Sequence, residues 1–329
     1  MGGHEGTTGD GPAGLELAVV CVTWNSATHL PALLASLGPG LEGVTWRLWV
    51  VDNASTDESV AVVRRLAPEA VVVQTGTNAG YAAAVNAGVR AVPPHAAVLV
   101  LNPDVRLDAG CGSALMGTLT RGDTGIAVPV QRDSDGRRHP TLRRAPTVRR
   151  ACAEALLGGR RAGRLGWGEL VTRPDAYLAD TRADWATGSV MAISRSCLDA
   201  VGEWDERFFL YSEETDFAQR AATLGFGLRL APLATCEHAR GASHENDALW
   251  ALLMINRVRL FAKRHNGFHA LMFRLALLAG ELARSLPGST THRAAVVALV
   301  GSDRRATALI EELRGAAGGP RIPEPIPRQ

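Results

Sequence analysis

The first 130 residues alternate short apolar runs with helix-like stretches, and this alternation constrains the fold more than any other feature. The apolar runs are rich in valine and lie at residues 17–23, 48–51, 71–73 and 97–101. The helix-like stretches lie between them, at residues 29–37, 58–66 and 81–91. Strands that are apolar throughout and are separated by helices are typical of βαβ units with a buried parallel sheet. The sequence therefore predicts an α/β fold with a mostly parallel central sheet flanked by helices.

Polar residues follow each of these predicted strands at the point where it ends. They are Thr23-Trp24-Asn25, Asp52-Asn53, Asn78-Ala79-Gly80 and Asn102-Pro103-Asp104. Right-handed crossovers place the carboxyl ends of parallel strands at one edge of the sheet, where open α/β sheets bind ligands. One polar ending would be an ordinary turn, but four of them predict a binding site at this edge.

The remainder of the chain divides by composition. Residues 132–182 are rich in Arg, Gly and Pro with little periodicity, and we interpret them as a long, partly helical basic excursion. Core-like sequence resumes at 185–194, followed by a predicted helix at 213–224 and strands at 228–230 and 235–238. Three helices are predicted at 248–264, 268–286 and 291–313. We therefore expect a flexible N-terminus (1–14), one domain (15–245), a C-terminal helical appendage (246–315) and a loose Pro-rich tail (316–329).

Several classes of protein are excluded by motif and composition. The five cysteines are scattered without a CxxC pair, which favours free thiols over a disulfide framework or a zinc site. The chain has no GxxxxGK[ST] phosphate loop, and the GxGxxG at 38–43 follows a helix and precedes a strand, the reverse of the dinucleotide-binding order. No signal-peptide pattern and no run of about 20 apolar residues is found. We expect a cytoplasmic protein, with a peripheral contact to the inner face of a membrane left open.

The charges are segregated although the net charge is only +2. Acidic residues are in excess in 1–131 and 165–245, and basic residues are in excess in 132–164 and 246–329. No aromatic residue lies within 132–164, which argues against base stacking and therefore against a nucleic-acid partner. The basic, apolar C-terminal helices fit either an interfacial membrane helix or an appendage with a solvated basic face.

Five motifs in this order resemble the family 2 inverting glycosyltransferases, with the rhamnosyltransferase-like branch most similar. They are TWNS at 23–26, DNASTD at 52–57, NAGYAAAVNAG at 78–88, NPD at 102–104 and FFLYSEETDF at 208–217. The resemblance covers residues 17–243. It implies the GT-A fold and transfer of a sugar, with inversion, from a nucleotide-diphosphate sugar to a hydroxyl acceptor.

The resemblance also implies a donor site at the polar strand edge. Asp52 can accept the imide N–H of uracil or thymine, with Thr23 and Asn25 near the base and ribose. The other residues carried over to donor binding are Asn53, Gly80, Asn86, Asn102 and Asp104.

A divalent cation, Mg²⁺ or Mn²⁺, is implied by the same comparison. Asp104 occupies the last acidic position of the metal-binding DxD triplet, and His238 stands where a histidine of related transferases approaches the metal or diphosphate. Asn102 replaces the first Asp, which removes an anionic ligand. We therefore expect the cation to bind mainly through Asp104 and the diphosphate of the donor.

The catalytic base is expected in Glu213-Glu214-Thr215-Asp216, since one carboxylate must deprotonate the acceptor hydroxyl. We assign it to Glu214, with Asp216 as the alternative, and expect Glu213 to complement a helix N-terminus. The residues implied at the acceptor side are Trp185, Gly188, Asp205 and Glu213.

The expected donor is dTDP-rhamnose or a UDP-sugar, and the expected acceptor is a saccharide, a lipid-linked saccharide or a natural product. Two alternatives stay open. Asn102 and Glu214 allow a catalytically inactive nucleotide-sugar-binding module. A sugar-phosphate nucleotidyltransferase would share the α/β sheet, but its Gly-rich basic loop after the first strand is missing.

Overall fold

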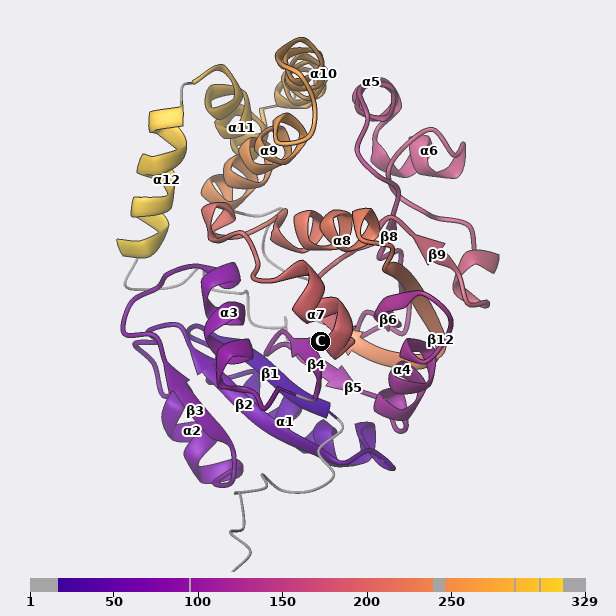
Figure 1. The fold of residues 1–329 in the computed structure, drawn as a ribbon. Coiled ribbons are helices and arrows are strands. Elements are labelled where there is room, and N and C mark those ends of the chain that lie inside the picture. Colours follow the sequence, from indigo (N-terminus) through magenta and orange to yellow (C-terminus); the bar gives the residue numbers. More distant parts are fainter. Residues whose placement is uncertain (1–16, 95, 239–245, 287, 302, 316–329) are drawn as a thin grey trace, which may run out of the picture.

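The computed structural model describes residues 17–94, 96–238, 246–286, 288–301 and 303–315 (Figure 1). The predicted flexible N-terminus and Pro-rich tail lie outside the described residues. Described residues form one large mixed sheet with helices on both faces, and a group of C-terminal helices beside it.

The predicted alternation of strands and helices over residues 17–101 is confirmed. The strands are β1 (Leu17–Thr23), β2 (Trp46–Asp52), β3 (Val71–Gln74) and β4 (Ala97–Leu101), and the helices between them are α1 (Leu30–Gly40), α2 (Ser59–Leu66) and α3 (Tyr81–Ala91). β1 pairs in parallel with β2 and β4, and β2 pairs in parallel with β3. The register sets Thr23 beside Asp52, so the carboxyl ends of β1 and β2 share one edge.

The second half of the sheet is mixed. Its strands are β5 (Val105–Leu107), β6 (Thr124–Arg132), β11 (Val190–Ile193) and β12 (Gly227–His238), and its helices are α4 (Cys111–Leu119), α7 (Arg195–Val201) and α8 (Glu213–Thr223). The strand order of the whole sheet is β3-β2-β1-β4-β11-β6-β12-β5. The prediction of two separate strands at 228–230 and 235–238 is wrong. They form the single strand β12, which keeps pairing with β6 across a register shift between Ala231 and Thr235.

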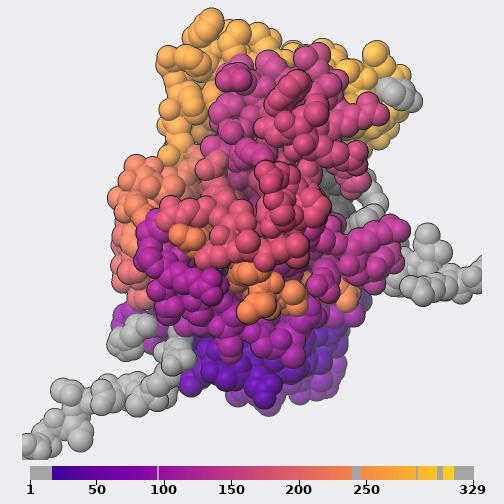
Figure 2. Space-filling view, turned by 90° about the vertical axis from the view of Figure 1, so that its right-hand side faces the viewer, coloured from indigo at the N-terminus to yellow at the C-terminus, as the bar shows by residue number. Residues whose placement is uncertain are grey.

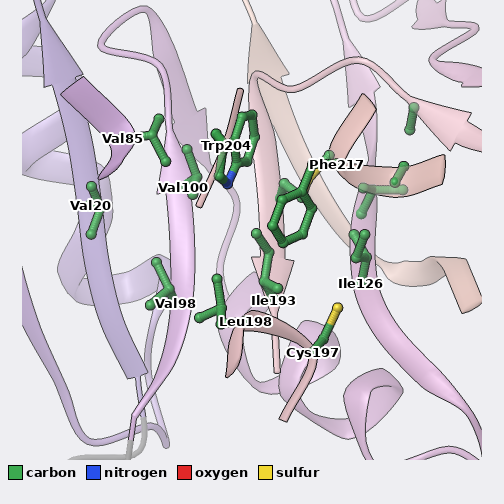
Figure 3. Packing of buried hydrophobic residues seen from close by; sticks show 14 of the residues in the cluster. Val20, Val85, Val98, Val100, Ile126, Ile193, Cys197, Leu198, Trp204 and Phe217 are labelled. Carbon is green, nitrogen blue, oxygen red and sulfur yellow. The ribbon is translucent and has the colours of Figure 1, made fainter. Parts of the chain in front are cut away.

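Side chains of the strands alternate between two buried clusters, one on each face of the sheet. In β1, Ala18, Val20 and Val22 enter one cluster, while Leu17, Val19 and Cys21 enter the other. Figure 3 shows the first cluster, in which Val20, Val98, Val100 and Ile193 of the sheet meet Trp204 and Phe217. Burial on both faces explains why these strands are apolar throughout rather than alternating.

The basic excursion is partly helical, as predicted, and contributes to the core. It contains α5 (Val148–Leu157), α6 (Gly159–Arg164), a 3-10 turn η1 (Asp175–Tyr177) and the short strands β7 (Arg138–His139), β8 (Leu142–Arg143) and β9 (Arg182–Ala183). β8 pairs with β10 (Trp185–Ala186). Leu142 and Tyr177 are buried in the same cluster as Trp204, so the excursion is anchored to the domain.

The C-terminal helices are α9 (Asp247–Ala262), α10 (Gly267–Ser285), α11 (Thr290–Val300) and α12 (Asp303–Gly315). The prediction of one helix over 291–313 is wrong, because α11 ends before Gly301, whose extended φ and ψ angles end the helical geometry. Met254, Phe261 and Phe273 form a separate apolar cluster with Ala151 of α5. The excursion therefore packs against these helices, as Figure 2 shows at the top of the molecule. Within the described residues, no helix has the length and apolar character needed to cross a membrane.

Candidate active site

The end of β1 and the end of β2 are joined by a network of buried polar groups. Thr23 and Asp52 are buried, and the Thr23 hydroxyl lies 3.4 Å from Asp52 Oδ1. The backbone N–H of Asn53 donates to the Thr23 carbonyl at 2.8 Å. The second oxygen of Asp52 accepts from the backbone N–H of Ser55 at 3.2 Å. This fixes the carboxylate at the sheet edge where a nucleotide base was expected.

Asn25 lies in the loop after β1 and has a left-handed backbone conformation, with φ of 48°. Asn tolerates this region better than most residues. Its side-chain oxygen accepts from the Thr56 backbone N–H at 2.8 Å, and its own N–H donates to the Ser55 hydroxyl at 2.9 Å. The loops after β1 and β2 are thus tied together.

The side chains of Asn53 and Asn86 form hydrogen bonds within the protein rather than pointing to open solvent. The Asn53 amide donates to Asn78 Oδ1 at 2.9 Å and accepts from the Ala79 N–H. Asn86 is buried, donates to the Trp204 carbonyl and accepts from the Trp204 N–H at 2.8 Å. Asn86, expected at the donor, therefore joins α3 to the segment before α8.

Asp104 and His238 meet, as the sequence predicts. β5 follows Asp104 and pairs with the end of β12, with Val105 opposite His238. His238 Nε2 lies 3.4 Å from Asp104 Oδ2. The other oxygen, Asp104 Oδ1, is buried and has no hydrogen-bond partner among the described residues.

This pair fits a divalent cation, because an orphaned carboxylate oxygen and an imidazole nitrogen are both suitable ligands. Asn102 lies in the same turn, with its backbone N–H donating to the Ser189 carbonyl at 2.9 Å. No cluster of three or more His, Cys, Asp or Glu side chains with metal-site geometry is found among the described residues. A cation here would therefore need further ligands from the donor.

Two adjacent glutamates begin α8. Glu213 is buried and Glu214 is partly exposed. Each has one buried carboxylate oxygen that finds no partner within the described part of the chain. Burial raises the pKa of Glu214 to about 7. Burial, together with the charge of Glu214, also raises the pKa of Glu213 well above its ordinary value. A carboxyl group with a pKa near neutrality is suited to general base catalysis.

Gly188 packs directly against Glu214. A Cβ built at Gly188 would lie 3.1 Å from the Glu214 Cβ, so a larger side chain would displace the glutamate. The Tyr81 hydroxyl lies 3.5 Å from the Gly188 carbonyl. Burial raises the pKa of Tyr81, and the charges of Glu213, Glu214 and Asp104 raise it further. The Tyr81 hydroxyl therefore lies next to Gly188, which in turn packs against Glu214.

The segment that leads into α8 is strained. Phe209, Tyr211 and Ser212 have φ angles of 23°, 70° and 75°, which L residues rarely adopt. On one side, the Phe209 carbonyl accepts from the Tyr81 N–H at 2.6 Å, and a Cβ at Gly80 would lie 2.4 Å from that oxygen. Gly80, whose own φ is 94°, is therefore required by both conformation and space.

On the other side, α9 holds the same segment. Asn256 is fully buried, and its amide donates to the carbonyls of Leu210 at 2.9 Å and Tyr211 at 3.3 Å. The strain of residues 209–212 is thus maintained by hydrogen bonds from a helix of the C-terminal group.

Asp216 and Asp205 are bound to cations of the protein. Asp216 is fully buried and pairs with Arg220 at 2.8 Å and with Lys263, the only lysine, at 2.7 Å. Lys263 also contacts Asp205 at 2.8 Å. Arg207 and Lys263 hold the pKa of Asp205 far below its ordinary value. Lys263, which follows α9, therefore ties both Asp216 of α8 and Asp205 of the preceding segment to the end of that helix. In contrast, Glu214 has no cationic partner at hydrogen-bonding distance among the described residues.

Trp185 lies on β10 beside the excursion. Its indole N–H donates to the Arg144 carbonyl at 3.1 Å, and the Arg143 guanidinium lies 5.6 Å from its ring. The tryptophan is partly exposed, which leaves it available to contact a sugar.

Two residues of this region, Tyr81 and Asn256, were not predicted from the sequence. Tyr81 could have been found, because it directly follows Gly80 within the NAGY motif. Asn256 could not, since a lone Asn in an apolar helix gives no sign of the distant loop that it contacts.

Comparison with known proteins agrees with this geometry. Residues 18–173 match the family described as Glycosyl transferase family 2. An N-acetylglucosaminyl-diphospho-decaprenol L-rhamnosyltransferase of Mycobacterium tuberculosis is 29% identical over 282 residues, which cover 82% of this chain and 91% of the relative. An uncharacterized glycosyltransferase of Mycobacterium bovis is 34% identical over 136 residues, which cover 41% of this chain and 58% of the relative.

Solved structures with a similar fold include the mannosyltransferase PcManGT from Pyrobaculum calidifontis in complex with GDP-Man and Mn²⁺. Its TM-score is 0.53 at 20% identity, covering 90% of this chain and 79% of that one. S. aureus TarS 1-349 in complex with UDP-GlcNAc has a TM-score of 0.51 at 15% identity, covering 92% and 86%. The fold and the ordered motifs lead to one conclusion: the chain has the GT-A fold, and its residues 18–173 match glycosyl transferase family 2.

Proposed function

We propose that this glycosyltransferase moves a rhamnosyl group from dTDP-rhamnose to a hydroxyl group of a lipid-linked saccharide, with inversion at the anomeric carbon. The observation that carries the proposal is the state of two carboxylates in the part of the chain that the structure describes. Asp104 lies beside His238 with one buried oxygen that has no partner there, and Glu214 packs against Gly188 without a cationic partner there. The choice of rhamnose is supported by the rhamnosyltransferase among the relatives.

In the proposed mechanism, the pyrimidine base binds at Asp52. The diphosphate lies beside Asp104, in the turn before β5, and His238, at the end of β12. Glu214 accepts the proton of the acceptor hydroxyl as that oxygen attacks the anomeric carbon from the side opposite the diphosphate. Gly188 leaves room for the Glu214 side chain, which packs directly against it. Attack from the opposite side accounts for inversion.

Asp104 and His238 would hold a divalent cation, which supplies neutralisation of the charge on the leaving diphosphate. The Mn²⁺ named with the mannosyltransferase structure supports this kind of cofactor.

The outer face of α10 favours a lipid-linked acceptor over a free one. Exposed apolar side chains recur at helical spacing along this face; they are Phe268, Leu271, Leu275, Leu282 and Leu286. Such a stripe in a basic segment is typical of a helix that lies in the interface of an anionic membrane. We expect sedimentation with phosphatidylglycerol vesicles, and its loss in Leu271→Ser/Leu275→Ser. Equal sedimentation of that variant would contradict the membrane contact.

The function is tested by supplying the full chain with dTDP-rhamnose, UDP-sugars and GDP-mannose, with and without Mn²⁺, and a lipid-diphosphate-linked N-acetylglucosamine. Mass spectrometry detects transfer, and NMR gives the anomeric configuration of the product. We expect Mn²⁺-dependent transfer from dTDP-rhamnose with inversion. Transfer from another donor alone would contradict the rhamnosyl assignment. Absence of all transfer would favour an inactive binding module, and synthesis of a nucleotide-sugar from a sugar phosphate would favour a nucleotidyltransferase.

A further inference from the structure

A large cavity lies between the basic excursion and the C-terminal helices, away from the donor edge. Its volume is about 810 Å³, and it is enclosed by α5, α6 and the β7–β8 segment on one side and by α9, α10 and α11 on the other. Seven arginines line it: Arg137, Arg138, Arg143, Arg160, Arg164, Arg257 and Arg284. A cavity of this size can hold a ligand much larger than a single ion.

The positive charge of the lining exceeds what the lining carboxylates neutralise. Arg257 is paired with Glu154 and Glu169, and Arg284 is paired with Glu281. By contrast, neither Arg137, Arg160 nor Arg164 forms an ion pair with any described residue. Arg138 Nε is buried and has no hydrogen-bond partner in the described part of the chain.

The cavity adjoins the acceptor side of the active site. Arg143, on its wall, belongs to β8, which pairs with β10 and thereby reaches Trp185. The neighbouring Thr141 carbonyl accepts from the Thr187 backbone N–H at 3.2 Å, next to Gly188. The positive charge of Arg143 also acts on Glu214. The wall of the cavity is therefore joined through β8 to the residues expected at the acceptor side.

We propose that this arginine-lined cavity binds the diphosphate group of the lipid-linked acceptor. The proposal rests on the function proposed above and adds the chemical group by which the acceptor is recognised. Guanidinium groups bind phosphate oxygens through paired, charge-assisted hydrogen bonds, and several unpaired arginines together suit a diphosphate better than a neutral sugar. The diphosphate of the donor is expected elsewhere, at Asp104 and His238.

Direct binding is tested with inorganic pyrophosphate and the full chain by titration calorimetry in the absence of divalent cation. The variant Arg160→Gln/Arg164→Gln removes two cavity charges. Its matched control, Arg149→Gln/Arg161→Gln, removes two exposed charges from the same excursion outside the cavity lining. We expect pyrophosphate to bind about tenfold more weakly to the cavity variant than to the wild type, and no change in the control. Equal weakening in both variants would overturn the proposal.

A kinetic test compares two acceptors that carry the same sugar and lipid, one joined through a diphosphate and one through a neutral linker. In the cavity variant we expect the acceptor KM to rise about tenfold for the diphosphate acceptor only, with the donor KM unchanged. An equal loss with both acceptors would overturn the proposal. A third result would also overturn it: a cavity variant that no longer sediments with phosphatidylglycerol vesicles but still binds pyrophosphate normally. That result would assign these arginines to lipid headgroups. Because the calorimetric test needs no turnover, it remains decisive even if the proposed transfer reaction is not found.

Discussion

The donor edge and the base-bearing segment are held in place in different ways. At the donor edge, Thr23, Asp52 and Asn53 contact one another and their immediate loops, all on strands that are adjacent in the sheet. The segment 209–212 and helix α8 depend on side chains from α9, mainly Asn256 and Lys263. Donor binding and proton removal should therefore respond differently to changes in the C-terminal helices.

From this difference we predict that the C-terminal group affects catalysis as well as packing. A helical appendage that merely covered the domain would affect stability alone. Here α9 supplies hydrogen bonds to two carbonyls of a strained segment and a cation to the buried Asp216. The following substitutions separate the two regions.

Glu214→Gln should have the largest effect, a fall in kcat of about 10²–10⁴-fold with donor binding retained, because it removes the general base. Because burial raises the pKa of Glu214 to about 7 and only the deprotonated form accepts a proton, wild-type kcat should rise with pH through about 7 and then level. The residual rate of the variant should lack this dependence.

The control for this prediction is Asp216→Asn. Breaking a buried ion pair costs about 3–5 kcal/mol, so this variant should mainly lose stability, measured by chemical unfolding. Wild-type turnover in Glu214→Gln, together with a lost pH dependence in Asp216→Asn, would move the base to Asp216.

Asp104→Asn should lower transfer by about 10²–10³-fold, because the cation loses its anionic protein ligand. Electron paramagnetic resonance should show weaker Mn²⁺ binding in the presence of dTDP. Asp108→Asn is the matched control, since Asp108 accepts from the Thr235 hydroxyl away from the edge. Unchanged Mn²⁺ affinity in Asp104→Asn would exclude the proposed cation site.

Asn256→Ala should lower kcat by about tenfold and leave the donor KM unchanged, because the carbonyls of Leu210 and Tyr211 lose their donor and the segment before Glu214 relaxes. Asn246→Ala, at the N-cap of the same helix, should cost about 1 kcal/mol of stability without changing kcat. If both variants instead lost kcat/KM for donor and acceptor to the same extent, α9 would act through stability alone.

Glu213→Gln should have the smallest effect and should act on stability. Burial raises the pKa of Glu213, so the folded state holds this proton more tightly than the unfolded state. Stability should therefore fall as pH rises above the ordinary range of glutamate. The variant should be the more stable form at pH 8, by on the order of 1–3 kcal/mol in urea unfolding, and the difference should vanish at low pH. The exposed Glu69→Gln should show no such difference; if it does, the effect is a general one of net charge.

Most of the first half of the fold could be predicted from the sequence. Strands buried on both faces leave a continuous apolar signal, which is why residues 17–101 were assigned correctly. β12 was divided in two because Pro232 interrupts the strand pattern, whereas in the structure the strand continues and resumes its pairing with β6 at Thr235. The break after α11 was missed because Gly301 is tolerated within a helical pattern.

The residue types and order of the site also followed from the sequence: carboxylates and amides after β1, β2 and β4, and acidic residues at the start of α8. The sequence could not separate Glu214 from Asp216, since both are carboxylates on one helical turn. The tertiary structure gives them different surroundings: Lys263 joins the local partner Arg220 in pairing with Asp216, whereas one Glu214 oxygen has no partner among the described residues. Local order fixes which strand ends share an edge, whereas the partner of a buried charge depends on helices far away in the chain. Only the tertiary structure could decide that long-range packing and the arginine-lined cavity that it encloses.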